Sequence, residues 1–182
     1  MLAKQVALLR GINVGGKNKL PMKDLVAMFV AAGCDDVQNF IQSGNIIFRA
    51  PARISAKLPE LIASEIASQF GYRTPVLLRT YEQLNNVIAD NPFVEAEAEE
   101  KALFVMFLAD LPSPSNVANL DADRSPPDRY KVLGKQIYLN LVNGAADTKL
   151  TNAYFDKQLA TTSTARNWRT VNKLLELMKP CD

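Results

Sequence analysis

Two apolar stretches over residues 37–48 are separated by the short polar segment Ser43-Gly44-Asn45. Glycine and asparagine between two strand-like stretches are typical of a β-hairpin turn. A turn of this length joins only antiparallel strands, whereas parallel strands need a long crossover connection. The hairpin therefore argues against an all-parallel sheet, and it is the strongest constraint that the sequence places on the fold.

The segments around this hairpin predict a strand, a helix, the two hairpin strands, a helix and a strand. Apolar spacing predicts strands at 4–9 and 74–80, and helices after Pro21 and over 54–69. This is the βαββαβ order of a ferredoxin-like split unit. A connecting helix over 81–90 and an acidic, solvated run over 95–100 follow.

The second half of the chain repeats this order in part. It predicts a strand at 103–108, a short helix at 116–120, a hairpin over 130–141 about Gly134-Lys135, and helices at 149–159 and 165–178. No closing strand is predicted between the last two helices. We therefore predict an α+β protein with two tandem ferredoxin-like (α/β-plait, βαββα-type) subdomains and an extra C-terminal helix. The predicted subdomains are 1–80 and 101–182, with 81–100 as the connecting helix and acidic linker.

The chain of 182 residues contains no histidine. This excludes Ser-His-Asp and Cys-His nucleophilic sites and removes the commonest metal ligand. We predict no metal site and no cofactor, and the sequence leaves open whether the protein is an enzyme. A net charge of +2 is too small to indicate a nucleic-acid or membrane partner by itself.

Two cysteines, Cys34 and Cys181, lie far apart in the sequence and do not form a disulfide framework. The first apolar run is short and Arg10 interrupts it, so it is not a secretory signal. No stretch reaches the length of a membrane-spanning helix. These features predict a cytoplasmic protein with no membrane partner, and they leave its oligomeric state open.

The apolar run Val6-Ala7-Leu8-Leu9 leads directly into a glycine loop, which we define as residues 11–19. Three glycines permit positive φ and close approach of a ligand, and backbone amides with nearby cations can hold an anion. The loop matches the P-loop spacing only in part, because Asn18 replaces the Ser or Thr that holds Mg²⁺ and Pro21 would break the following helix. The alternative is a connecting loop whose glycines serve only its turns.

Two further segments could contribute to a site. Gln42-Ser43-Gly44-Asn45 forms a polar corner, although turn geometry alone also explains it. Near the C-terminus lies a run rich in threonine and serine, in which Ser163 or Thr164 is predicted to cap the helix at 165–178. Free amides and Arg166 at a helix start suit an anion. Ordinary capping with a core Trp168 is the alternative.

The segments LLRGINVGGKNK, IQSGN and ARNWRTV together resemble the uncharacterised bacterial family called domain of unknown function sixteen-ninety-seven. The resemblance implies two α/β-plait subdomains and a soluble cytoplasmic protein, and it implies no reaction. The family's motif positions correspond here to Arg10, Gly11, Asn13, Gly15, Gly16, Gln42, Ser43, Asn45, Arg166, Asn167 and Trp168.

The leading hypothesis is a protein that binds a small anionic ligand, phosphorylated or nucleotide-like, in one cleft formed by all three segments. The alternatives are a nucleic-acid-binding module, which is disfavoured because residues 46–49 lack the RNP1 aromatic pattern, and an interaction protein with no small ligand. The predicted ligand-binding residues are Arg10, Asn13, Gly15, Gly16, Lys17, Asn18, Gln42, Ser43, Asn45, Arg166 and Asn167.

Overall fold

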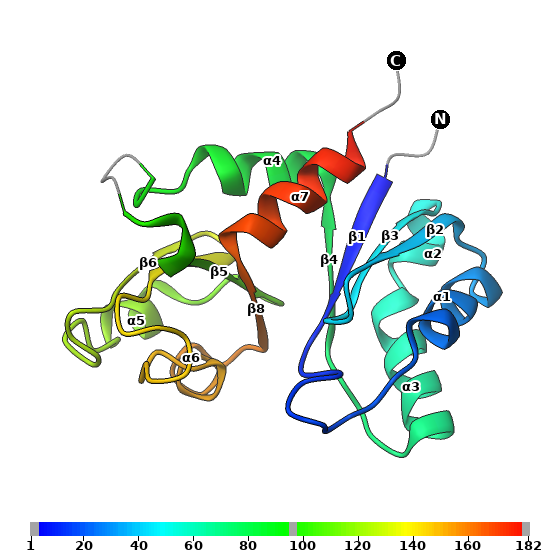
Figure 1. Ribbon diagram of the computed structural model, residues 1–182, viewed down its shortest axis with the longest axis horizontal. Helices are drawn as coiled ribbons and strands as arrows, with labels where there is room; N and C mark the ends of the chain where they lie inside the picture. The colour runs from blue at the N-terminus through cyan, green and yellow to red at the C-terminus, as the bar shows by residue number, and fades with distance from the viewer. Residues whose placement is uncertain (1–3, 95–97, 180–182) are drawn as a thin grey trace. The chain divides into compact units, whose positions relative to one another are not determined.

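The computed structural model describes residues 4–94 and 98–179 (Figure 1). These residues divide into two compact units, one formed by the described parts of 1–85 and 173–182 and the other by 86–172. The two divisions fall within helices α4 (Tyr81–Ala89) and α7 (Trp168–Met178). The sequence predicts that all of 101–182 belongs to the second subdomain, whereas the described residues 173–179 group with the first unit.

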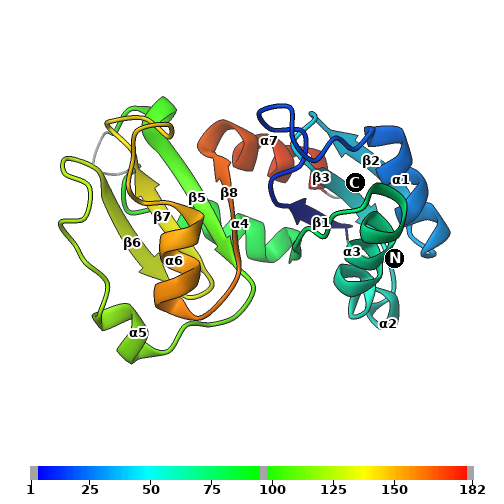
Figure 2. The same cartoon turned by 90° about the horizontal axis from the view of Figure 1, so that it is seen from below.

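The first unit contains a four-stranded antiparallel sheet in the order β2-β3-β1-β4. Three helices, α1, α2 and α3, lie on one face of this sheet (Figures 1 and 2). The predicted strands and hairpin of this half are confirmed. In chain order the elements are β1 (Lys4–Leu9), α1 (Met22–Ala31), β2 (Asp35–Phe40), β3 (Asn45–Arg49), α2 (Ala52–Ser55), α3 (Leu58–Phe70) and β4 (Val76–Thr80).

The central strands β1 and β3 of this sheet are buried on both faces. On the face toward the helices, Ala7 and Leu9 of β1 join Ile46 and Phe48 of β3 in one core cluster with apolar residues of α1 and α3. The alternate residues on the opposite face are also buried: Val6, Leu8, Ile47 and Leu77. Runs of consecutive apolar residues, rather than strict alternation, are typical of strands buried on both faces.

The single helix predicted over 54–69 is wrong at its start, because the structure contains the short α2 and a separate α3. Pro59 occupies the first turn of α3. A proline inside a continuous helix would lack the N–H for one hydrogen bond and would clash with the preceding turn, so the helix must begin anew there. At its other end α3 stops at Gly71, which has the left-handed φ of 76° that suits glycine.

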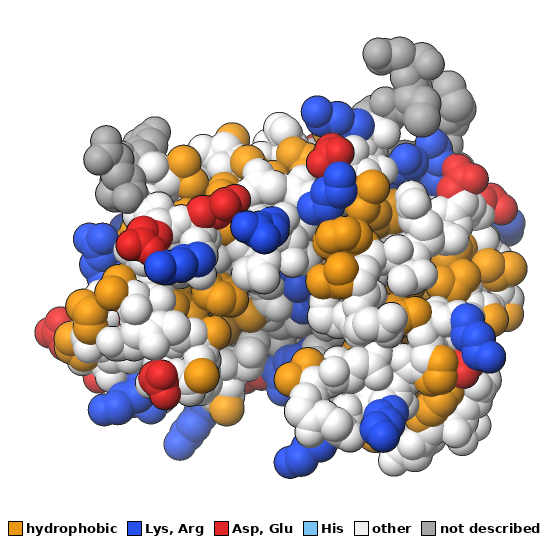
Figure 3. Space-filling model, viewed as in Figure 1, with side chains coloured by type: hydrophobic (Ala, Val, Ile, Leu, Met, Phe, Trp, Pro, Cys, Tyr) orange, Lys and Arg blue, Asp and Glu red, His pale blue; other side chains and the backbone are white. Residues whose placement is uncertain are grey.

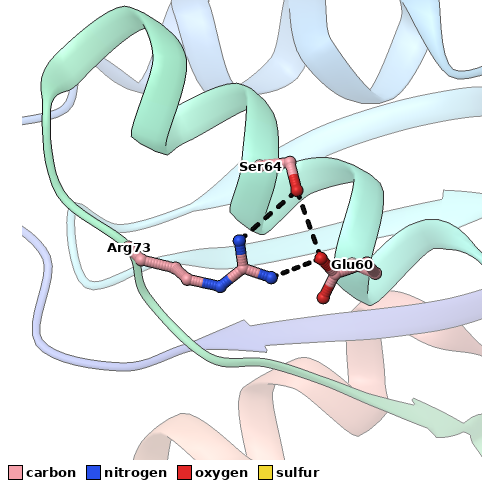
Figure 4. Close-up of polar contacts among 3 residues, drawn as sticks. All are labelled: Glu60, Ser64 and Arg73. Atoms are coloured by element: carbon pink, nitrogen blue, oxygen red, sulfur yellow. Dashed lines mark hydrogen bonds and ion pairs between the residues drawn. The ribbon is translucent and has the colours of Figure 1, made fainter.

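Arg73 ties the segment after α3 back onto that helix (Figure 4). Its guanidinium pairs with Glu60 and donates a hydrogen bond to the Ser64 hydroxyl, which in turn donates to Glu60. The hydrogen bond and the positive charge of Arg73 hold the pKa of Glu60 below its usual range. Glu60 is fully exposed, so its contact with Arg73 orders the chain locally rather than stabilising the core.

The second unit contains a second four-stranded antiparallel sheet, in the order β6-β7-β5-β8. Its helices α5 and α6 pack on one face, where Met106, Leu139 and Phe155 belong to one core cluster. The strand at 103–108 and the hairpin over 130–141 are confirmed. The elements are β5 (Leu103–Leu108), α5 (Pro114–Ala118), β6 (Arg129–Leu133), β7 (Gln136–Asn140), α6 (Asn152–Leu159) and β8 (Ser163–Asn167).

The sequence predicts no closing strand in the second half of the chain, and this prediction is wrong. Residues 163–167 form β8, which pairs antiparallel with β5 and places Arg166 opposite Val105. The last helix therefore begins at Trp168 rather than at 165, and neither Ser163 nor Thr164 caps it. The Asn167 side-chain oxygen accepts a hydrogen bond from the Thr170 amide at 2.8 Å, so Asn167 is the cap.

Over the described residues the chain thus forms two four-stranded antiparallel sheets and seven α-helices, which confirms the α+β class. None of the described helices is long and apolar enough to cross a membrane. Residues 95–97 of the acidic run and Cys181 lie outside the described residues.

Candidate functional site

The glycine loop folds into a small hairpin of its own. Val14 and Lys17 form a β-bridge, and the Lys17 amide donates to the Val14 carbonyl at 3.1 Å. Between them Gly15 and Gly16 have φ values of 57° and 74°. Positive φ at both central residues is the requirement of a type I′ turn, which explains why two glycines occur here.

Asn13 holds this loop against its surroundings. Its side-chain nitrogen donates to the Leu20 and Gln42 carbonyls, both at 2.9 Å, and its side-chain oxygen accepts from the Leu20 amide at 2.8 Å. Asn13 also has a left-handed φ of 54°, which asparagine tolerates better than most residues. Both amide hydrogens of this side chain are therefore used inside the protein, which makes Asn13 a brace for the loop.

The two ends of the loop are joined by similar bonds. The Asn18 side chain donates to the Gly11 carbonyl at 3.0 Å, and the Asn13 amide donates to the Asn18 carbonyl at 3.1 Å. The Tyr72 hydroxyl donates to that same carbonyl at 2.9 Å. Next to the loop, the buried Thr74 hydroxyl donates to the Arg10 carbonyl. Tyr72 and Thr74 were not predicted, because nothing in their own segment indicates a bond to a loop some 60 positions away.

The first hairpin lies against the glycine loop. Gly44 accepts a hydrogen bond from the Leu9 amide at 2.8 Å, and a Cβ on Gly44 would come within 2.8 Å of Leu9 and 2.9 Å of Ile12. Only glycine fits at this approach. The fully buried Asn45 side chain donates to the Ser43 hydroxyl and the Phe40 carbonyl, both at 3.1 Å. The Gln42 carbonyl accepts a hydrogen bond from the Asn13 side chain, so the hairpin turn is bonded directly to the glycine loop.

The outer part of the loop carries unpaired cations and amides. Val14, Gly15, Gly16, Lys17, Asn18 and Lys19 are all exposed. The Lys17 and Lys19 ammonium groups form no ion pair with any residue that the structure describes. The amides of Gly15 and Gly16 likewise have no hydrogen-bond acceptor among the described residues. Figure 3 shows Lys and Arg side chains at the lower edge of the molecule, where this loop lies in Figure 1.

The loop supplies hydrogen-bond donors and positive charge rather than acid–base groups. Residues 10–19 contain no carboxylate, thiol or phenol. Among the described residues, no group of three or more His, Cys, Asp or Glu side chains could hold a metal ion. The local chemistry is therefore suited to holding an anion.

Arg166 and Asn167 belong to the second unit, so their participation in the same site as the glycine loop stays a prediction. Arg166 is buried in β8, where its guanidinium donates to the Thr164 hydroxyl at 2.9 Å and to the Ala165 carbonyl at 2.7 Å. Burial lowers the pKa of this guanidinium to about 10, so it remains charged at neutral pH. Trp168 is buried too, with 7% of its surface exposed, which agrees with the core alternative.

Arg79, which the sequence does not single out, is the counterpart of Arg166 in the first unit. It occupies the same place in β4 that Arg166 occupies in β8: each lies opposite a valine in the first strand of its sheet, Val6 or Val105. Arg79 is also buried, and burial lowers its pKa to about 10. The signal in the sequence is an arginine followed by a helix cap and an aromatic residue, Arg79-Thr80-Tyr81 and Arg166-Asn167-Trp168.

The family described as Protein of unknown function (DUF1697) matches residues 2–138. This range contains the glycine loop and the first hairpin but not the third motif, ARNWRTV. The conserved bacterial protein SP0830 from Streptococcus pneumoniae is 22% identical and has a similar structure, with a TM-score of 0.75 over 98% of this chain and 100% of that chain. At this identity the likeness concerns the fold alone. Among curated proteins, none is significantly similar to this chain.

Proposed function

We propose that this chain, which belongs to the family described as Protein of unknown function (DUF1697), binds the phosphate or similar anionic group of a small ligand at the glycine loop. One observation carries the proposal. Two consecutive exposed glycine amides lack acceptors among the described residues, and Lys17 follows them directly with no carboxylate paired to it. Amides and ammonium groups in this arrangement suit phosphate oxygens.

The predicted site residues then divide into two roles. Gly15, Gly16 and Lys17 contact the ligand, with Arg10 at the base of the loop adding charge. Asn13, Asn18, Gln42, Ser43 and Asn45 act as positioning residues, because their hydrogen bonds hold the loop and the first hairpin together. Arg166 and Asn167 contribute only if the second unit faces the loop.

We also infer that each unit is a ferredoxin-like plait. The strand order 2-3-1-4 with antiparallel neighbours, and helices on one face of the sheet, support this assignment for both units. A cytoplasmic location remains a prediction from the sequence.

The arrangement of the first sheet favours a small ligand over RNA. Ferredoxin-like RNA-binding sheets stack bases on exposed aromatic residues of their central strands. Here the face of β1 and β3 opposite α1, α2 and α3 presents Val6, Leu8 and Ile47, which are aliphatic and fully buried. Stacking of this kind therefore has no platform on the central strands of the first unit.

Amide chemical shifts test the proposal directly. Titration of the ¹⁵N-labelled protein with inorganic phosphate, pyrophosphate, nucleotides and hexose phosphates should shift the Gly15 and Gly16 resonances for at least one class. Lys17→Gln should then weaken binding roughly ten- to hundredfold, because a charge-assisted hydrogen bond contributes about 1.5–3 kcal/mol. Lys157→Gln, which removes an exposed lysine in the second unit, is the matched control and should bind normally.

Unshifted Gly15 and Gly16 amides with every compound would refute the proposal, as would equal affinity of the wild type and Lys17→Gln. Arg166→Lys, which keeps the charge but changes its geometry, tests the second unit separately. Weaker binding by this variant with unchanged thermal stability would bring Arg166 into the site.

A further inference from the structure

A groove runs between α1 and α3 in the first unit. Two cavities of about 620 and 320 Å³ lie along it and share Ala32 and Leu61. Asp24, early in α1, and Gln69, near the end of α3, line only the first cavity, whereas the shared Ala32, just after α1, meets Lys57, just before α3, in the second. The two helices are therefore antiparallel, and the cavities are successive parts of one feature, which we call the α1–α3 groove.

The middle of the α1–α3 groove is apolar and lined by small residues. Ala27, Ala31 and Met28 contribute from α1, and Ile62 and Leu61 contribute from α3. Leu61 has 49% of its surface exposed, which is unusual for a leucine on a helix that otherwise packs into a core. Alanines allow another backbone or side chain to approach closely, so this groove can receive an apolar side chain.

The two ends of the groove carry opposite charges. Asp24 and Glu65 line the first cavity, and Arg53 and Lys57 line the second. None of these four side chains forms an ion pair with a residue that the structure describes. Glu60 on the same helix differs, because it lines neither cavity and pairs with Arg73 (Figure 4). The charges along the groove are thus left available to a partner.

We propose that the α1–α3 groove binds a second copy of this chain. In a two-fold symmetric dimer the same patch occurs on both sides of the interface, so the patch must complement itself. A two-fold axis through the middle of the groove places the acidic end of one copy opposite the basic end of the other. One rotation therefore satisfies both ends at once, and it brings the apolar middles together.

Leu61 is the central apolar contact of this dimer. It lines both cavities, so in the symmetric arrangement each Leu61 lies at the axis and inserts toward the alanines of the other copy. Interface energy is usually concentrated in a few such central residues, while charged groups at the rim set orientation and partner choice.

A charge-swap experiment tests the symmetric arrangement in sedimentation equilibrium of the full chain. The wild type should show a monomer–dimer equilibrium at about 1–500 μM, because interfaces of modest size with few central contacts bind in the micromolar range or more weakly. Asp24→Lys with Glu65→Lys makes both ends basic, and Arg53→Glu with Lys57→Glu makes both ends acidic. Each double variant alone should self-associate at least tenfold more weakly, because like charges then face each other.

An equimolar mixture of the two double variants should recover dimers, because their ends are complementary. The wild type remaining monomeric at 500 μM would overturn the proposal. The proposal would also fail if either double variant alone dimerised as tightly as the wild type. It would fail equally if the mixture contained no more dimer than either variant alone.

Leu61→Glu provides an independent test, because it places a charge at the centre of the interface. It should abolish dimerisation without loss of the native circular dichroism spectrum, since Leu61 is half-exposed already. Leu111→Glu, at an exposed leucine of the second unit, is the matched control and should dimerise normally. Equal dimerisation by both leucine variants would refute the groove as the interface.

Discussion

Asn13 is expected to stabilise the glycine loop more than any other polar residue in it. Asn13→Ala removes three hydrogen bonds to the backbone, two to Leu20 and one to Gln42, besides a weaker one to the Met22 sulfur. At about 0.5–1.5 kcal/mol for each bond, the free energy of unfolding should fall by about 1.5–4.5 kcal/mol. Alanine at the left-handed φ of 54° adds about 1 kcal/mol of backbone strain.

Asn13→Gly separates these two contributions, because glycine loses the same hydrogen bonds without the strain. The glycine variant should therefore be destabilised less than the alanine variant. Urea denaturation gives the total effect, and hydrogen exchange at the Leu20 amide gives the local one, since that amide donates to the Asn13 oxygen. Asn85→Ala, at an exposed position of α4, is the matched control. Stability of Asn13→Ala within about 0.5 kcal/mol of the wild type, with unchanged Leu20 exchange, would refute this role.

Three further predictions concern the first unit. Gly44→Ala should destabilise this unit by about 2–4 kcal/mol in urea denaturation, because the added Cβ clashes with Leu9 and Ile12 and the φ is positive. Gly71→Ala has a similar φ and open space around the Cβ, so it should cost only about 1 kcal/mol. Equal effects of the two substitutions would contradict the clash. Burial raises the pKa of Cys34 from 9.0 to about 11, so the stabilising contribution of the buried thiol is present below pH 9 and lost as the pH rises toward 11. In a Cys181→Ser background, the folded protein should therefore react slowly with a thiol reagent at pH 8, and rapid reaction would contradict burial. Arg73 lowers the pKa of Glu60, so this ion pair contributes to stability at a pH above the ordinary glutamate pKa, and the contribution is lost as the pH falls. The substitution Arg73→Gln should raise the Glu60 pKa measured by ¹³C NMR titration, and an unchanged pKa would contradict the pairing.

Most of the fold could be predicted because its signals are local. Both hairpins have turn residues between apolar stretches, and these specify antiparallel pairing within a few positions of the chain. Helix α1 begins directly after Pro21, as the sequence predicts. The break before α3 also had a local signal, Pro59, and the error there came from giving apolar periodicity more weight than proline.

Strand β8 could not be predicted in this way. Its sequence, Ser163-Thr164-Ala165-Arg166-Asn167, has little apolar alternation, and hydroxyl residues before a helix indicate a cap. Pairing with β5, nearly 60 positions earlier, determines its conformation instead. Tertiary context overrides local preference most readily in a short polar segment of this kind.

The sequence singles out the residues of the loop as a candidate site, but it does not separate their roles. A glycine pair between Val14 and Lys17 predicts a turn, and lysines without carboxylates nearby predict an anion. Nothing in the sequence distinguishes an asparagine that contacts a ligand from one that binds its own backbone, because the same amide serves both. The hydrogen bond from Asn13 to the Gln42 carbonyl favours the second role, and this contact depends on folding.

The second unit offers an internal comparison for the proposed anion site. Its first strand ends in the same way as that of the first unit: the Leu108 amide donates to the carbonyl of a hairpin residue, Lys135, as the Leu9 amide donates to Gly44. The connection that follows is different, however, because Asp110-Leu111-Pro112 contains an acid and neither glycine nor lysine. The proposed anion site therefore depends on the connection rather than on the framework that the two units share. If the first unit binds phosphate and the second does not, we expect the difference to come from the twelve residues between Leu9 and Met22 and from the hairpin turn that supports them.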